Sequence, residues 1–132
     1  MNRQQLIDYC LTLPGSYEDY PFDGLTDPGK WTVMRHEANT KSFALIFERA
    51  GRLCINLKCD PEVAEWLRLE FADVIPGYHM NKVHWNTILV GGDVPDDELE
   101  HMIVESYDLI KPKSTRRAVN PVERRLDNRQ DL

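Results

Sequence analysis

The chain has 132 residues, of which 42% are hydrophobic and 29% charged, so it is large enough for a single globular domain with its own core. No apolar run reaches the roughly 18–20 residues that cross a bilayer, and the first eight residues lack the apolar stretch of a signal peptide, so we expect a cytoplasmic protein. The three Cys residues contain no CxxC pair, and we therefore expect neither a disulfide framework nor a zinc ribbon: Cys10, Cys54 and Cys59.

The net charge of −6 is distributed unevenly along the chain. Residues 1–110 contain 9 Lys and Arg against 19 Asp and Glu, whereas residues 111–132 contain 7 against 3. An acidic body disfavours nucleic-acid binding through bulk charge, and the basic C-terminal run is the segment that could supply it. Such a run is also typical of a solvated helix end and a flexible terminus. We predict one domain over residues 1–112 and a basic, flexible tail over 113–132.

The first predicted element is a helix over residues 2–13, where Leu6, Cys10 and Leu13 recur at three- and four-residue steps. Pro14 and Gly15 end it. Residues 16–30 contain two Pro, two Gly and four acids, which predicts an ordered loop. Its aromatic residues indicate that it packs onto the domain.

Three strands of an antiparallel meander are predicted next, over residues 31–37, 42–49 and 53–58. In the second strand Phe43, Leu45 and Phe47 share one face by alternation. Gly51 lies in a connection short enough for a hairpin. In the third strand the apolar residues at 53, 55 and 57 share one face, which leaves Asn56 and Lys58 on the other.

The second half of the chain predicts two helices and one further strand. Asp60 and Pro61 start a helix that runs to residue 71. A short strand near Val74 is an optional addition, residues 82–90 form the fourth strand, and a last helix follows Pro95 and ends before Pro112. The order α-β-β-β-α-β-α predicts an α+β two-layer sandwich, with the helices on one face of an antiparallel sheet and the other face open to water.

The residues 76–87, PGYHMNKVHWNT, carry the densest group of aromatic and hydrogen-bonding side chains in the sequence. If Val83, Trp85 and Thr87 face the helices, then the residues between them face solvent. With the polar residues of the neighbouring strand and turn, these form a predicted binding surface: Asn56, Lys58, His79, Asn81, Lys82, His84 and Asn86. The same side chains also suit the plain solvated side of a half-buried strand.

This surface could serve as a metal site, as a catalytic site or as a recognition surface. A metal site is disfavoured because no HxxxH or CxxC pair occurs, and catalysis is disfavoured because no nucleophile or orienting carboxylate lies beside His84. Recognition suits the residue types, since aromatic and imidazole rings stack on bases while Lys and Asn bond to phosphates or base edges. We therefore expect a non-catalytic protein without metal or cofactor.

Four motifs carry a specific family resemblance. The segment PGYHMNKVHWNT, preceded by CINLKCDPE at 54–62 and followed by VPDDEL at 94–99, resembles the MmcQ/YjbR family. So does LPGSYEDYPF at 13–22, and the similarity spans roughly residues 2–112 in order. It implies a fold like that of the bacterial frataxin homologue CyaY, and it implies DNA binding.

From the residues and the resemblance together we expect a monomeric DNA-binding protein that uses the open sheet face and the basic tail. The alternative is a module that binds a protein or a small ligand and has no nucleic-acid role. A positive stripe through Lys58 and Lys82 would favour DNA, and a negative sheet face would favour the alternative.

Overall fold

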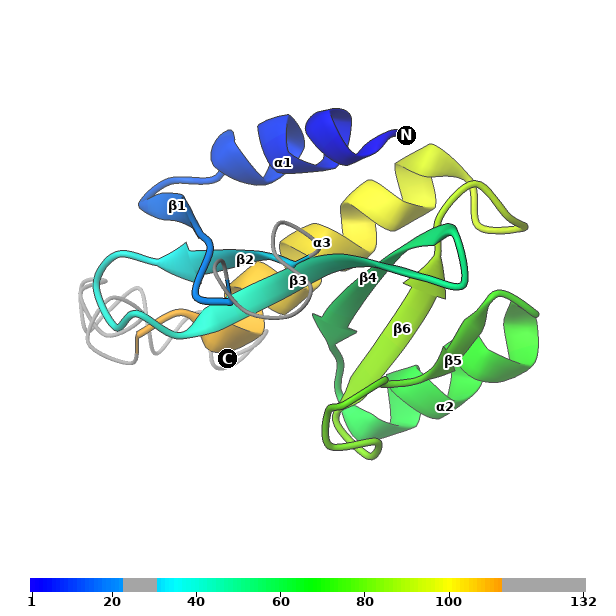
Figure 1. Ribbon diagram of the computed structural model, residues 1–132. Coiled ribbons are helices and arrows are strands. Elements are labelled where there is room, and N and C mark those ends of the chain that lie inside the picture. Colours follow the sequence, from blue (N-terminus) through cyan, green and yellow to red (C-terminus); the bar gives the residue numbers. More distant parts are fainter. Residues whose placement is uncertain (23–30, 113–132) are drawn as a thin grey trace.

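The structure, a computed structural model, describes residues 1–22 and 31–112 (Figure 1). It contains three helices and six strands within these ranges. The helices are α1 (Arg3–Leu11), α2 (Pro61–Glu70) and α3 (Asp96–Ile110). The strands are β1 (Ser16–Asp19), β2 (Thr32–His36), β3 (Ser42–Arg49), β4 (Arg52–Lys58), β5 (Val74–Pro76) and β6 (Trp85–Leu89).

The strands form one antiparallel sheet in the order β1-β2-β3-β4-β6-β5. This confirms the predicted α+β architecture and the predicted element order, with the optional strand present as β5. Residues 16–19 were expected in a loop and instead form the edge strand β1, because Ser16–Asp19 pairs with β2 along its whole length. Residues 23–30 of that predicted loop lie outside the described ranges, as does the predicted tail 113–132.

The three helices start and end near where their sequence signals place them. Asn2 caps α1 with a reciprocal capping box to Gln5, and Asp60 caps α2 by accepting a hydrogen bond from the Glu62 amide. The first turn of α3 contains three carboxylates, which suit the positive end of the helix. None of the helices in residues 1–22 and 31–112 is long and apolar enough to cross a membrane.

The hydrophobic core lies between the helices and one face of the sheet, here called the helix face. Ile46, Ile55 and Ile88 occupy this face in register across β3, β4 and β6. Ser106 of α3 fastens the two layers, because its hydroxyl donates to the Phe43 carbonyl and accepts from the Lys58 amide.

A β-bulge in β3 changes which residues face the helices. Met34 pairs with Ala44 but Arg35 pairs with Ser42, so β3 has one extra residue at this point. A bulge of this kind turns two successive side chains toward the same side. Phe43 accordingly packs against the ring of Tyr107 from α3, whereas Leu45 and Phe47 face away from the helices. The expectation that all three share one face was wrong for this reason.

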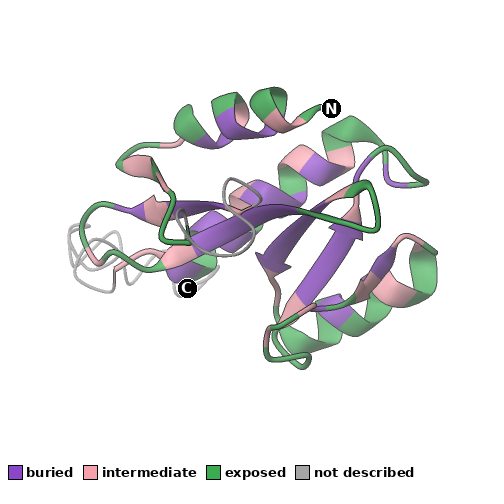
Figure 2. Ribbon diagram, in the orientation of Figure 1, coloured by how far each residue is buried: buried purple, intermediate pink, exposed green. Residues whose placement is uncertain are grey.

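The opposite side of the sheet, the helix-free face, is not simply left to water as expected. It carries residues that are buried although no described helix covers them (Figure 2). They are Val33, Leu45, Phe47, Cys54, Asn56 and Thr87. The residues that cover part of this face belong to the segment between β5 and β6 and to the start of β2, and their contacts define the candidate site.

Candidate nucleic-acid interface

Residues 77–84 form a loop in which Tyr78 and His79 fold back over the helix-free face. Asn56 donates from Nδ2 to the Tyr78 carbonyl at 2.9 Å, and the Tyr78 amide donates to Thr87 Oγ1 at 2.8 Å. The Thr87 hydroxyl in turn donates to Asn56 Oδ1. Both side chains have no solvent exposure. This buried polar pair therefore fixes the position of the Tyr78 backbone on the sheet.

The Tyr78 ring is the middle layer of a stack that rises from the sheet. It lies over Phe47, with 5.6 Å between ring centroids and 22° between planes. The Arg49 guanidinium lies above it, with Cζ 4.2 Å from the ring centroid. Trp31 also stacks on Phe47, with 4.3 Å between ring centroids and 11° between planes, and the His79 ring centroid lies 4.0 Å from that of Tyr78. The outermost members are a guanidinium and an imidazole, both exposed.

Arg49 is held in place by a ring rather than by a carboxylate. Among the described residues its guanidinium makes a cation–π contact and no ion pair. Its five N–H donors therefore remain available to an incoming acceptor. Arg52 is its register partner across the β3–β4 hairpin, 3.7 Å from Asp73. Two guanidinium groups thus stand at the same end of the helix-free face.

The acidic residues of the body are concentrated on the helices. Helix α3 contains six carboxylates and no Lys or Arg, and α2 contains three carboxylates against one Arg. Across β3 and β4 the balance is reversed, with three cations and one carboxylate, Glu48. By strand alternation Glu48 lies on the helix face, where its carboxylate is 3.7 Å from the guanidinium of Arg3 in α1. The net negative charge therefore does not describe the helix-free face.

Two of the predicted surface residues are fully buried, and their expected exposure was wrong. Asn56 lies under Tyr78 as described above. Asn86 pairs with Leu57 and faces the helices, where its Oδ1 accepts from Arg68 Nε at 2.6 Å and its Nδ2 donates to the Ala64 carbonyl at 3.1 Å. The alternation was assigned in the wrong phase because Asn86 and Ile88, not Trp85 and Thr87, turn to the helix layer.

The error has a local cause, since the strand begins at Trp85 and not at residue 82. Residues 82–84 belong to a turn in which Asn81 Oδ1 accepts hydrogen bonds from the amides of Val83 and His84. Val83 is consequently 58% exposed although it looks like a core residue in the sequence.

The five remaining predicted residues lie in the loop before β6 and at the end of β4. His79, Asn81, Lys82 and His84 are exposed members of the loop, and Lys58 is half-buried at the end of β4, paired with Trp85. The Lys82 ammonium donates to the Gly77 carbonyl at 3.0 Å. The structure thus gathers four of these side chains in one short loop, and their role in binding stays a prediction.

The predicted binding surface omits three residues at the centre of the site: Trp31, Arg49 and Tyr78. Arg49 ends a strand whose alternation with Phe47 puts it on the helix-free face, and this parity could have identified it. Trp31 precedes β2 and Tyr78 precedes β6, so no strand period applies to either of them. Their convergence on Phe47 depends on tertiary structure.

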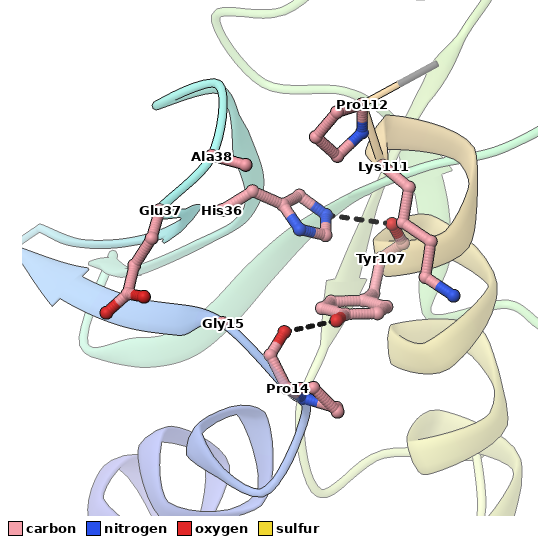
Figure 3. Close-up of a pocket in the computed structure, with 8 residues that line it drawn as sticks. All are labelled: Pro14, Gly15, His36, Glu37, Ala38, Tyr107, Lys111 and Pro112. Carbon is pink, nitrogen blue, oxygen red and sulfur yellow. Dashed lines mark hydrogen bonds between the residues drawn. The ribbon is translucent and has the colours of Figure 1, made fainter. Parts of the chain in front are cut away.

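A hollow of about 430 Å³ lies at the end of the sheet away from Arg49, against the C-terminal end of α3 (Figure 3). His36 is 3% exposed beside it, and its Nε2 lies 2.9 Å from the Tyr107 carbonyl. The Tyr107 hydroxyl donates to the Pro14 carbonyl. Burial lowers the pKa of His36, which keeps the imidazole neutral and able to donate one proton to that carbonyl. These bonds fasten α3 to the sheet.

The thiols and the metal-ligand types complete the chemistry of the described residues. Burial raises the pKa of Cys10 to about 12 and that of Cys59 to about 11, so both thiols are protonated at neutral pH and are poor nucleophiles. Within residues 1–22 and 31–112 no cluster of three His, Cys, Asp or Glu side chains could hold a metal ion.

The fold and this site define an α+β sheet-and-helix domain with an aromatic and cationic surface. Residues 11–109 match the YjbR family model, and the chain belongs to the YjbR family. It is 32% identical to protein YjbR of Escherichia coli K12 over 107 residues, which are 81% of this chain and 85% of that protein. It is 30% identical to protein YyaQ of Bacillus subtilis 168 over 121 residues, covering 84% of this chain and 99% of that one.

Two solved structures share the fold. A crystal structure of a Pseudomonas syringae protein superposes with a TM-score of 0.74 at 32% identity and covers 84% of this chain and 100% of its own. The crystal structure of protein DR2400 from Deinococcus radiodurans gives a TM-score of 0.72 at 32% identity and covers 92% and 84%.

Proposed function

We propose that this chain is a small, non-catalytic DNA-binding protein that contacts DNA through the helix-free face of its sheet. The observation that carries the proposal is the stack of Phe47, Tyr78 and Arg49, in which an Arg without a carboxylate partner among the described residues is held at the surface. A fixed guanidinium suits a phosphate group or a base edge.

The distribution of charge supports the same surface. A phosphate backbone approaching from the helix side would meet the carboxylates of α2 and α3, whereas on the helix-free side it meets Arg49 and Arg52. Repulsion on one side and attraction on the other would orient the protein on a polyanion despite its net charge of −6. The exposed His79 adds a ring that can stack on a base or donate to a phosphate.

The proposal that the chain is not an enzyme rests on the kind of groups at the site. Arg49, Lys82 and His79 can bind anions, and among the described residues no hydrogen bond joins the His79 ring to a carboxylate or hydroxyl that could form a catalytic pair with it. The family members compared above have names that assign no activity.

Fluorescence anisotropy with a labelled DNA duplex at ~50 mM salt tests this function. Arg49→Ala should weaken binding several-fold and should reduce the dependence of log K on log salt by about 0.9, the contribution of one phosphate contact. Lys41→Ala is the matched control, because it removes one exposed cation from the β2–β3 turn at the far end of β3. A protein lacking residues 113–132 separates the contribution of the tail.

Two results would overturn the proposal. The first is the absence of measurable affinity of the full chain at ~50 mM salt. The second is an equal loss of affinity in Lys41→Ala and Arg49→Ala, which would show that the protein binds through diffuse charge and not through this face.

A further inference from the structure

A second surface, on the outer side of α2, combines exposed apolar side chains with carboxylates. Leu69 is 83% exposed, Trp66 is 57% exposed and Val63 is 41% exposed. Figure 2 shows most of α2 coloured as exposed. These three residues follow one another at three-residue steps, and such positions are neighbours on a helix surface. They form an apolar strip along α2 that no described residue covers.

The strip continues onto α3 through a shallow hollow of about 230 Å³. Val63 lines this hollow from α2, and Leu109, which is 46% exposed, lines it from α3. The hollow therefore joins the two helices into one apolar surface, here called the α2–α3 surface: Val63, Trp66, Leu69 and Leu109. Large exposed apolar groups that adjoin one another mark interaction sites more often than scattered ones do.

The surroundings of the α2–α3 surface are acidic. On α2 three exposed carboxylates adjoin the apolar residues in the sequence: Glu62, Glu65 and Glu70. Asp60, Glu105 and Asp108 line the hollow. The single cation of α2, Arg68, is turned away from this surface, because its guanidinium bonds to Asn86 Oδ1 and to the carbonyls of Lys82 and Trp85.

The charges decide which kind of partner fits. A second copy of this chain, related by a two-fold axis, would place the same carboxylates opposite one another, and like charges at an interface are unfavourable. A membrane with anionic lipids is disfavoured for the same reason. A segment with alternating apolar and cationic side chains would fill the strip and neutralise its edges.

We propose that the α2–α3 surface docks a basic amphipathic helix of a partner protein, with Trp66 and Leu69 as the apolar anchors. This site lies on the helical layer, on the opposite side of the sheet from Arg49 and Tyr78, and it does not depend on the proposed DNA binding. The partner's apolar side chains contact Val63, Trp66 and Leu69, and its Lys or Arg side chains face the carboxylates of α2.

The probe for the test is a peptide of about 18 residues made of Leu and Lys, with Leu at helical i, i+3, i+4 and i+7 spacing. Titration calorimetry measures its affinity for the full chain, and amide chemical shifts in NMR locate the site. A peptide with Glu in place of Lys is the control for charge. We expect saturable binding of the Lys peptide only, with shifts concentrated in α2 and around Leu109.

Substitutions at exposed residues should leave folding unchanged, so they report on binding alone. Trp66→Ser with Leu69→Ser should weaken binding of the Lys peptide at least tenfold, whereas Leu11→Ser, an equally polar change at the 41% exposed Leu11 of α1, should leave it unchanged. Glu62→Lys with Glu65→Lys should also weaken it, and Glu37→Lys on the β2–β3 turn should do so far less.

The proposal is overturned if the Glu peptide binds as well as the Lys peptide, or if shifts map away from α2. It is also overturned if Trp66→Ser with Leu69→Ser matches Leu11→Ser. A dimer in sedimentation that Leu69→Ser dissolves would assign the surface to a second copy instead. DNA affinity should be unaffected by the paired Ser substitutions, so failure of either function leaves the other separately measurable.

Discussion

Asn86→Ala separates a structural role from a binding role at a residue that the sequence places on the surface. In the structure Asn86 is fully buried under α2 and bridges Arg68 and the Ala64 carbonyl. The substitution removes both hydrogen bonds and leaves the Arg68 Nε–H without this acceptor. If Asn86 were a solvated surface residue, the same change would be nearly neutral.

The expected magnitude follows from the two bonds. A hydrogen bond to a charged group contributes about 1.5–3 kcal/mol, and the neutral amide–carbonyl bond contributes about 0.5–1.5 kcal/mol. We therefore expect Asn86→Ala to lower the free energy of unfolding by about 3 kcal/mol. A double-mutant cycle with Arg68→Ala should give a coupling energy of about 1.5–3 kcal/mol, since the 2.6 Å contact is the charged one.

Urea unfolding followed by circular dichroism measures both quantities, with m-values compared to confirm that the extent of unfolding is unchanged. His84→Ala is the control, because His84 is exposed two residues away and should change stability by less than about 0.5 kcal/mol. The reasoning would be refuted if Asn86→Ala and His84→Ala cost the same, or if the coupling energy with Arg68 were zero.

Three further predictions concern pH, packing and turn geometry. Because burial lowers the pKa of His36, protonation of this residue favours the unfolded chain. The free energy of unfolding should therefore fall as the pH is lowered below ~6.5, by at most about 1.4 kcal/mol per pH unit. Urea melts of His36→Gln should lack this pH-dependent loss. Gly77→Ala places a Cβ 2.8 Å from Trp85 Cβ, so thermal unfolding should show a loss of about 1–3 kcal/mol; an unchanged Tm would contradict this contact. Ala50 has φ +52° in the hairpin turn with Gly51, a conformation that Asn adopts more easily than Ala. In urea melts Ala50→Asn should therefore raise the free energy of unfolding by about 0.5–1 kcal/mol. A lower value would argue against this turn geometry.

The charges are distributed unevenly between the helices and the strands, so the net charge describes neither face of the sheet. The sum over the sequence predicts repulsion from a polyanion, and the carboxylates of α3 account for much of that sum. Their positions follow from helix physics, since three of them occupy the first turn of α3, where the helix dipole favours negative charge. The cations of β3 and β4 lie on the helix-free face: Arg49, Arg52 and Lys58.

The sequence by itself determined the fold class and most of the element boundaries. The capping residue Asp60 and the turn at Gly51 act through bonds between close neighbours in the chain, and local signals of this kind can be read without knowing the fold. The alternation of β4 was also assigned correctly, because Ile55 and Leu57 differ clearly from the polar Asn56 and Lys58 that alternate with them.

Only the tertiary structure decided which face each polar residue of β6 occupies. Trp85 and Thr87 have apolar character, yet they lie on the helix-free face, and Asn86 is buried because Arg68 and the Ala64 carbonyl, 18 and 22 residues earlier in the chain, satisfy its amide. The same is true of the stack of Arg49 on Tyr78 on Phe47. A polar residue can be buried wherever distant partners bond to it, and no local pattern records where those partners will be.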